Sequence, residues 1–200
     1  MYPDYEKVEV NLEDEIDDKG ILIIWGGADI HPSLYDRPNY ASHVGEIIGH
    51  RDRIEVGLMA RAIELGLPII GVCRGAQLAC AAAGGILIQD VSGHAGQPHY
   101  IETKDGKKLM TSSLHHQMMY PWSVSHELLA WSSPSRSKRY VGITEEEGEK
   151  IPKLNDLPIE PEIVWFPGIK CLAIQGHPEF LHKDHEFNVY VKDLCGNYFK

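Results

Sequence analysis

Residues 67–83 read LPIIGVCRGAQLACAAA, and this stretch decides the fold. An apolar segment that predicts a strand ends at Gly71-Val72-Cys73-Arg74-Gly75, and small residues that predict a helix over 74–83 follow at once. A cysteine between two glycines in a strand-to-helix turn is the elbow that presents a nucleophile. The glycines are needed because a β-carbon on either side would collide with the neighbouring strand or helix. Unpaired N–H groups at the start of the helix favour a thiolate, so Cys73 is the predicted nucleophile.

The segments around this elbow predict an α/β domain. Residues 21–25 form a continuous apolar run, as expected for a strand that is buried on both faces. Residues 51–65 carry apolar side chains at helical spacing. Strand, helix, strand, helix is the order of a three-layer, flavodoxin-like fold with a parallel sheet and helices on both faces. Ligands of such sheets bind beyond the carboxyl ends of the strands, where Gly26, Gly27 and Cys73 are expected.

The remainder of the chain is less regular. Residues 93–161 alternate in short stretches rich in Ser, Gly and Pro, which predicts loops and small β-hairpins over the active-site end of the sheet. Two short buried strands are predicted over 163–166 and 171–174. Asp184 is predicted to cap a final helix that ends at Gly196.

A base for the cysteine follows the second of these strands, in the segment QGHPEF over residues 175–180. Pro178 favours an extended backbone at His177, and side chains two residues apart in an extended segment point the same way. Glu179 would therefore orient the imidazole of His177 while the other ring nitrogen faces the thiol of Cys73. This arrangement predicts a Cys–His–Glu catalytic triad.

Composition narrows the classes of partner. The 200 residues suffice for one sizeable core, and a single domain over 1–200 is expected. A formal charge of −10 argues against nucleic acid as a partner, because phosphate binding needs clustered Lys and Arg. No apolar run is long enough to cross a bilayer, and residues 1–6 lack the features of a signal peptide, so no membrane partner is expected. Four cysteines without a CxxC pair indicate a cytoplasmic location.

Five segments together resemble the class I glutamine amidotransferase-like superfamily. Two of them are the elbow GVCRGAQ at 71–77 and GHPE at 176–179. Three others are similar to its γ-glutamyl hydrolase-like (peptidase C26-like) branch, which includes the γ-glutamyl-GABA hydrolases: GGADIHPSLY at 26–35, GGILIQD at 84–90 and SLHHQ at 113–117. The segments occur in the family's order. The chain departs from the pattern at position 28, where alanine replaces the usual proline.

The resemblance implies hydrolysis of a γ-glutamyl amide bond, in glutamine or a γ-glutamyl–amine conjugate, through a thioester and without a cofactor. An oxyanion hole needs N–H donors, and the backbone N–H of Arg74 at the start of the predicted helix is one. The resemblance implies the backbone N–H of Gly27 as the second. The residues that it implies around the substrate are Gly26, Gln77, Ser113, His115, His116 and Gln117. Family members have a strand and a helix before the segment that resembles residues 5–10, and this first strand and helix are expected to be absent here.

Several alternatives remain open at this stage. The chain could be a glutaminase component that supplies ammonia to a separate synthetase partner, or a non-catalytic relative that binds a ligand. Its partner could be such a synthetase or a second copy of the same chain. A metal site is a rival chemistry, since His177, His182 and His185 lie close in sequence to Glu179 and Asp184. The elbow needs no metal, so none is expected.

Overall fold

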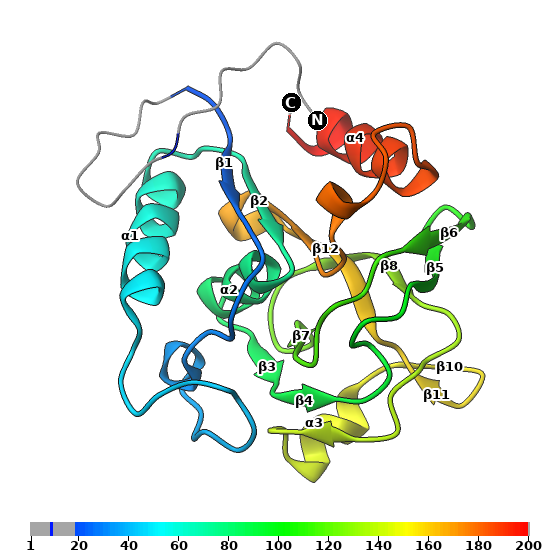
Figure 1. Cartoon of the computed structure of the whole chain (residues 1–200), viewed down its shortest axis with the longest axis horizontal. Helices are drawn as coiled ribbons and strands as arrows, with labels where there is room; N and C mark the ends of the chain where they lie inside the picture. Colours follow the sequence, from blue (N-terminus) through cyan, green and yellow to red (C-terminus); the bar gives the residue numbers. More distant parts are fainter. Residues whose placement is uncertain (1–8, 10–18, 200) are drawn as a thin grey trace.

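The computed structural model describes residues 9 and 19–199, which form a central seven-stranded sheet with helices packed on it (Figure 1). The strand order in the sheet is β1 (Leu22–Ile24), β2 (Ile69–Val72), β13 (Cys171–Ile174), β12 (Pro161–Phe166), β8 (Glu127–Ser132), β5 (His99–Thr103) and β6 (Lys108–Thr111). The α-helices are α1 (His50–Glu64), α2 (Arg74–Ala82), α3 (Glu145–Lys150) and α4 (Glu186–Tyr198). Short 3₁₀ helices are η1 (Pro32–Tyr35), η2 (Pro167–Ile169) and η3 (Pro178–Phe180).

The predicted α/β fold is confirmed, and its sheet is mixed rather than parallel throughout. Strands β1, β2 and β13 run parallel to one another. Strands β12, β8, β5 and β6 continue the sheet with antiparallel pairing. The reason is the length of the connections: α1 provides a crossover between β1 and β2, whereas only the short η2 separates β12 from β13. A connection of that length allows an antiparallel pair only.

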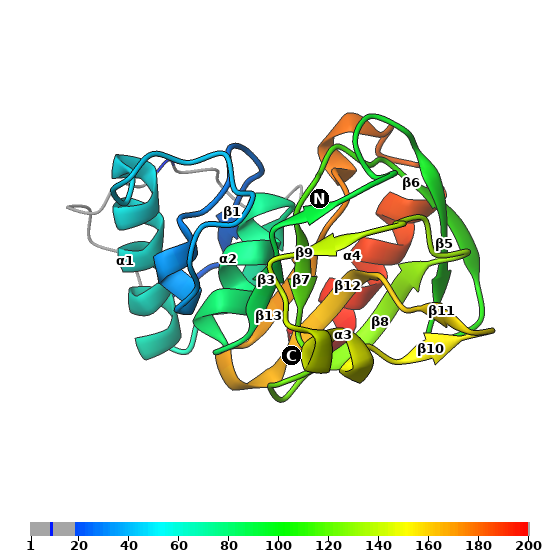
Figure 2. The same cartoon turned by 90° about the horizontal axis from the view of Figure 1, so that it is seen from below.

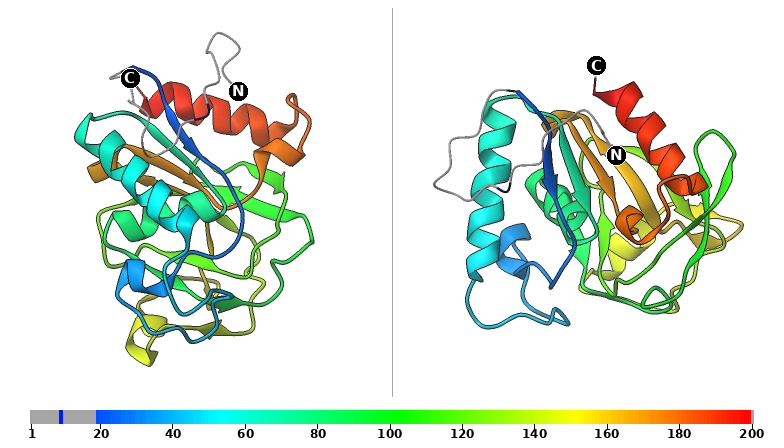
Figure 3. Two further views of the ribbon diagram at one scale, coloured as in Figure 1. Left: turned by 60° about the vertical axis from the view of Figure 1, so that its left-hand side comes forward. Right: turned by 45° about the horizontal axis from the view of Figure 1, so that its top comes forward.

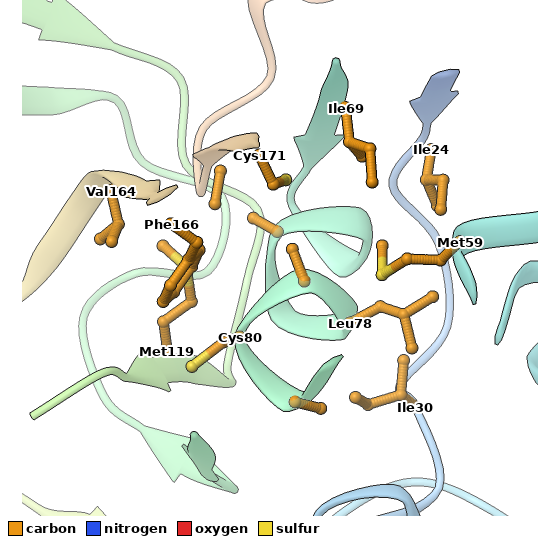
Figure 4. Close-up of a cluster of buried hydrophobic side chains, with 14 of the residues drawn as sticks. Ile24, Ile30, Met59, Ile69, Leu78, Cys80, Met119, Val164, Phe166 and Cys171 are labelled. Atoms are coloured by element: carbon orange, nitrogen blue, oxygen red, sulfur yellow. The ribbon is translucent and has the colours of Figure 1, made fainter. Parts of the chain in front are cut away.

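Side chains along β2 alternate between two cores, which fixes the three layers. Ile69 packs in a cluster with Met59 of α1 and Leu78 of α2 (Figure 4). Ile70 and Val72 pack in a second cluster that contains the buried face of α4. Helices α1 and α2 therefore cover one face of the sheet and α4 covers the other, as the right-hand view of Figure 3 shows.

The region over residues 93–161 is partly a continuation of the sheet. Strands β5, β6 and β8 belong to the central sheet. The remainder, with neighbouring segments, makes small antiparallel pairs and the helix α3 (Figure 2). These pairs are β3 (Ile86–Ile88) with β7 (Met118–Tyr120), β4 (Asp90–Val91) with β9 (Tyr140–Val141), and β10 (Lys153–Leu154) with β11 (Leu157–Pro158).

The final helix differs from its prediction at both ends. His185 rather than Asp184 is the N-cap, because its Nδ1 accepts a hydrogen bond from the N–H of Phe187 at 3.2 Å. Helix α4 continues through Gly196 to Tyr198, since packing of its buried face outweighs the low helix propensity of one glycine. Apart from Glu9, the predicted segment over residues 5–10 lies outside the described residues. The expectation that a first strand and helix are absent therefore stays a prediction.

Candidate active site

The elbow between β2 and α2 holds Cys73 in a strained backbone conformation. Its φ of +50° and ψ of −104° lie where L-residues are rarely found, and such strain concentrates at functional sites. Both flanking glycines are required: a Cβ at Gly71 would lie 2.4 Å from the carbonyl oxygen of Gly75, and one at Gly75 would lie 2.1 Å from that of Ile24. The N–H of Cys73 donates to the carbonyl of Ile174 at 2.7 Å. The elbow is thereby tied to β13, the strand that leads to His177.

His177 faces Cys73 from the loop after β13. Its Nδ1 forms a 2.7 Å hydrogen bond with Oε1 of Glu179, and because a carboxylate accepts, Nδ1 carries the hydrogen. The interaction with the side chain of Cys73, followed by the bond to Glu179, raises the pKa of His177 to about 9 against the opposing effect of burial. Ser112 holds the backbone of His177 on both sides, since its Oγ accepts from the N–H at 2.8 Å and donates to the carbonyl at 2.9 Å.

A turn makes the contact between His177 and Glu179. The prediction of an extended segment there was wrong. The backbone of His177 has φ −111° and ψ 89°, but Pro178 begins the 3₁₀ helix η3. This turn brings Glu179 back to the imidazole and stacks the ring of Phe180 on it, with ring centroids 4.6 Å apart.

The turn after β1 lies against the elbow. A Cβ at Gly26 would lie 2.5 Å from Cε1 of His177 and 3.4 Å from Cβ of Cys73, so only glycine fits there. Gly27 has a φ of +153°, which L side chains rarely adopt. Arg51 of α1 donates from Nη2 to the carbonyl oxygens of Trp25 and Gly26, both at 3.0 Å. Helix α1 therefore fixes the turn that carries the predicted oxyanion N–H of Gly27.

The side chain of Arg74 is buried and paired with α1. It forms ion pairs with Asp52 and Glu55. Asp52 also accepts from the N–H of His31 at 3.2 Å, and Glu55 accepts from Nε of Arg51 at 2.6 Å. This network joins the start of α2 to α1 and, through Arg51, to the glycine turn. Arg74 thus has a structural side chain, and its predicted oxyanion role involves the backbone N–H alone.

A cleft of about 570 Å³ opens at the cysteine. Its described lining residues are Trp25, Gly26, Gly27, Cys73, Leu114, His177, Glu179 and Phe180. The three large apolar members, Trp25, Leu114 and Phe180, are 44%, 54% and 60% exposed. Aromatic and aliphatic surface therefore surrounds Cys73, and none of these eight residues is a lysine or an arginine.

Five of the predicted substrate-binding side chains have partners inside the protein and do not line this cleft: Gln77, Ser113, His115, His116 and Gln117. Gln77 donates to the carbonyl of Gln117 at 3.1 Å, and Gln117 donates to Oγ of Ser42 at 2.7 Å. Ser113 donates to the carbonyl of His94, and His116 bonds to Asp29. Leu114 is the residue of this loop that reaches the cleft. A role for the other five in substrate binding stays a prediction.

Sequence reasoning missed several residues around the cysteine. Gln175 is buried, with Nε2 3.9 Å from Sγ of Cys73, and it lies two residues before His177 on the same loop. A polar residue at the end of a buried strand was the available signal for it. Trp25 and Phe180 are adjacent to the glycine turn and to Glu179, and their positions beside predicted site residues were a weaker signal.

The histidines of the alternative metal site do not converge. Nδ1 of His182 accepts from the N–H of Asp184, and Nδ1 of His185 caps α4. Within the described part of the chain, two other groups bring three possible ligand atoms together. One is His94, His115 and Glu162, and the other is Asp29, His43 and His116.

Comparison with known proteins shows the family of this chain. The sequence pattern of Peptidase C26 matches residues 6–133. The chain is also 36% identical over 183 residues to the candidate glutamine amidotransferase-like protein YvdE of Lactococcus lactis subsp. lactis, covering 88% of this chain and 72% of the relative. The chain belongs to the Peptidase C26 family. A second relative of this Peptidase C26 protein is NtpR of Enterococcus hirae, 28% identical over 192 residues, with 90% of this chain and 77% of NtpR covered.

Solved structures show the same fold. A candidate GMP synthase component from Thermoplasma acidophilum matches 89% of this Peptidase C26 protein and 73% of its own chain, with a TM-score of 0.53 and 12% identity. PurLQS from Thermotoga maritima matches 94% of this chain and 84% of its own, with a TM-score of 0.52 and 16% identity. The resemblance to class I glutamine amidotransferase-like proteins is confirmed. Among the described residues, every helix is too short or too polar to cross a membrane.

Proposed function

We propose that this Peptidase C26 protein hydrolyses the amide bond of a γ-glutamyl amide with Cys73 as the nucleophile, and that the leaving group is an amine with an apolar portion. The observation that carries the proposal is the strained elbow, which sets Cys73 against His177 at a cleft. A cysteine that serves only to fill the core needs neither a positive φ nor an imidazole partner.

The reaction would proceed through a thioester. Sγ of Cys73 attacks the amide carbonyl carbon, and charge develops on the oxygen, where the N–H groups of Gly27 and Arg74 stabilise it. The C–N bond then breaks, the imidazolium of His177 gives its proton to the leaving nitrogen, and a γ-glutamyl thioester remains on Cys73. Neutral His177 next takes a proton from water, whose oxygen attacks the thioester. The thiolate of Cys73 leaves, and glutamate is released.

Glu179 would serve as the positioning residue for His177. Its 2.7 Å bond to Nδ1 fixes the tautomer, so that Nε2 is the atom that exchanges the proton. The raised pKa of about 9 keeps the imidazole protonated at neutral pH, which suits its role as the acid for the leaving nitrogen. Ser112 would set the distance of the ring from the thiol by holding the backbone at His177.

The apolar wall of the cleft supports an amine larger than ammonia. Trp25, Leu114 and Phe180 present large exposed surfaces around the cysteine, and apolar surface gains free energy when a ligand covers it. Ammonia would leave this surface uncovered. A free-standing hydrolase of γ-glutamyl–amine conjugates therefore accounts for the cleft better than a glutaminase component does.

The test compares kcat/KM for L-glutamine with that for γ-glutamyl methylamide, butylamide and benzylamide. We expect the value to rise with the apolar size of the amine and to vanish in Cys73→Ala. Trp25→Ala should reduce the preference for benzylamide over glutamine by about tenfold or more. Tyr40→Ala is the matched control, because Tyr40 is an aromatic residue that is 62% exposed and does not line the cleft.

Other results would favour the alternatives. Turnover of glutamine alone, stimulated by an added synthetase, would support a glutaminase component instead. The absence of any turnover that depends on Cys73 would support a non-catalytic binding protein.

A further inference from the structure

A cluster of buried ionisable side chains lies apart from the residues that line the cleft. Three imidazoles and two carboxylates, each at most 4% exposed, gather where β5, β12 and two loops meet: His94, His99, His115, Glu160 and Glu162. Burying such groups costs free energy unless each finds a partner of complementary charge or hydrogen bonding. The proposed reaction uses none of these side chains. Their arrangement therefore needs an explanation of its own.

Hydrogen bonds fix which ring nitrogen carries the hydrogen in two of the histidines. Nε2 of His94 bonds to Oε2 of Glu160 at 3.0 Å, and Nδ1 of His115 bonds to the carbonyl of Gln117 at 2.9 Å. Carboxylates and carbonyls only accept, so these two nitrogens are the donors. In each neutral ring the opposite nitrogen, Nδ1 of His94 and Nε2 of His115, then presents a bare lone pair.

The bare lone pairs converge on Glu162. Nδ1 of His94 lies 3.5 Å from Oε1 of Glu162, and Nε2 of His115 lies 3.9 Å from the same oxygen. Both separations exceed a hydrogen bond. Among the residues that the structure describes, neither nitrogen has a hydrogen-bond partner, and neither does Oε2 of Glu162. Three lone-pair donors that face one another in a buried site repel unless a proton or a metal cation lies between them.

The spacing of these atoms suits a metal ion. Ligand bonds of about 2.0–2.1 Å in a tetrahedral arrangement place neighbouring ligand atoms about 3.3 Å apart. The two nitrogens and one carboxylate oxygen lie within 4.8 Å of one another. Oε1 of Glu162 is 3.5 Å from Nδ1 of His94 and 3.9 Å from Nε2 of His115. Small shifts of the side chains would bring all three into bonding range of one ion.

We propose that Nδ1 of His94, Nε2 of His115 and the carboxylate of Glu162 bind a divalent transition-metal ion, with Zn²⁺ as the first choice. Two imidazoles and a carboxylate are a donor set that zinc uses. Each ligand also has the outer partner that metal ligands normally have: Glu160 for His94, the Gln117 carbonyl for His115, and Nε2 of His99 at 2.9 Å for Glu162. The expectation of no metal is revised by this proposal.

The ion would brace the wall of the cleft without touching the reacting atoms. Ser113 donates to the carbonyl of His94, and Ala95 forms a β-bridge with Leu114, which lines the cleft. The carbonyl of Glu162 accepts from the N–H of Gln175 at 2.8 Å, beside Cys73. The metal would hold two loops and β12 together behind the nucleophile, so its role is structural.

The first experiment measures the metal content of the full chain, expressed and purified without a polyhistidine tag or chelator, by inductively coupled plasma mass spectrometry. We expect about one zinc or other divalent transition-metal ion per chain, retained through gel filtration. His115→Gln and Glu162→Gln should each lose most of it. His43→Ala is the matched control, because His43 belongs to the second, partly exposed group with Asp29 and His116, and this variant should keep its metal.

A second experiment, on the Tm and the absorption spectrum of the wild-type protein, tests the proposal even if the variants fold poorly. Metal-free wild-type protein, prepared with a chelator, should show a lower Tm that returns on addition of Zn²⁺, and Co²⁺ should give visible absorption bands in the wild type. His115→Gln should show neither response. Less than about a tenth of an ion per chain, together with a Tm that ignores added Zn²⁺, would overturn the proposal. So would metal that is lost in His43→Ala and kept in His115→Gln.

Discussion

Replacing Glu179 by glutamine would separate the charge of this carboxylate from its hydrogen bond. The amide oxygen of glutamine can still accept from Nδ1 of His177, so the ring keeps its tautomer and its position. The negative charge beside the imidazolium is lost. Because the interaction with Cys73 is the larger cause of the raised pKa of His177 and Glu179 is the next, the pKa should fall from about 9 toward, but not below, the ordinary value of 6.5.

The structure sets an upper limit on the effect. At about pH 7.5, a histidine with a pKa of about 9 is ~97% protonated, whereas one with a pKa of about 6.5 is ~9% protonated. Glu179→Gln should therefore lower the imidazolium population at this pH by less than about tenfold, because the larger contribution of Cys73 remains. The effect on stability has a definite sign as well. A pKa raised by folding contributes stability that is fully present below about pH 6.5 and is lost as the pH rises through about 9, so the variant should be destabilised more at pH 6 than at pH 10.

Two assays follow the change. An NMR titration should show a lower midpoint for His177, with His177→Gln used to assign its signal. Alkylation of Cys73 by iodoacetamide at pH 7.5 should slow, because less imidazolium faces the thiol. Glu186→Gln is the control, because Glu186 is an exposed carboxylate near the start of α4 that accepts from Met110. A folded Glu179→Gln protein with an unchanged midpoint and alkylation rate would refute the assignment of Glu179 as the partner of His177.

Gly75→Ala should lower the Tm by about 10 °C or prevent folding, since the added Cβ would lie 2.1 Å from the backbone oxygen of Ile24; differential scanning calorimetry tests this. Asp52→Asn removes one charge partner of the buried Arg74, and urea denaturation should show a free energy of unfolding lower by about 3 kcal/mol. Ser112→Ala removes both hydrogen bonds that hold the backbone of His177, so kcat/KM should fall while the free energy of unfolding decreases by only about 1–3 kcal/mol.

Matched variants serve as controls for the first two of these predictions. Gly168→Ala introduces the same methyl group where a Cβ would meet no atom within 4 Å, and the Tm should hardly change. Glu64→Gln breaks an exposed pair with Arg61 on the same helix as Asp52 and should cost less than about 1 kcal/mol. Equal losses for Asp52→Asn and Glu64→Gln would contradict the structural role given to the Arg74 network.

Much of the fold was predictable because its signals are local. The apolar run before Cys73 and the small residues after it predict β2 and α2, and helical spacing over 51–65 predicts α1 almost to its ends. The direction in which two strands pair is not a local signal, because it depends on the length of the connection between them. The four residues between 166 and 171 already exclude a parallel pair of β12 and β13, a signal that the predicted parallel sheet overlooked.

The site also contains some features that are visible in the sequence and others that appear only in the folded chain. The elbow glycines and the spacing of His177 and Glu179 are visible in the sequence, although the contact is made by a 3₁₀ turn. The partners of Arg74 on α1 are 22 and 19 positions away, and only the folded chain brings them together. The buried histidine and glutamate cluster was equally hidden, because its members come from loops and strands separated by up to 68 positions in the sequence.

The most direct test of the central claim is to capture the thioester. The protein is mixed with the γ-glutamyl amide that it turns over fastest, quenched in acid within one turnover, and analysed by intact-protein and peptide mass spectrometry. The account predicts a γ-glutamyl adduct on Cys73, one amine released for each adduct formed, and neither product in Cys73→Ala. Amine release that persists in Cys73→Ala, or an adduct on another residue, would contradict it.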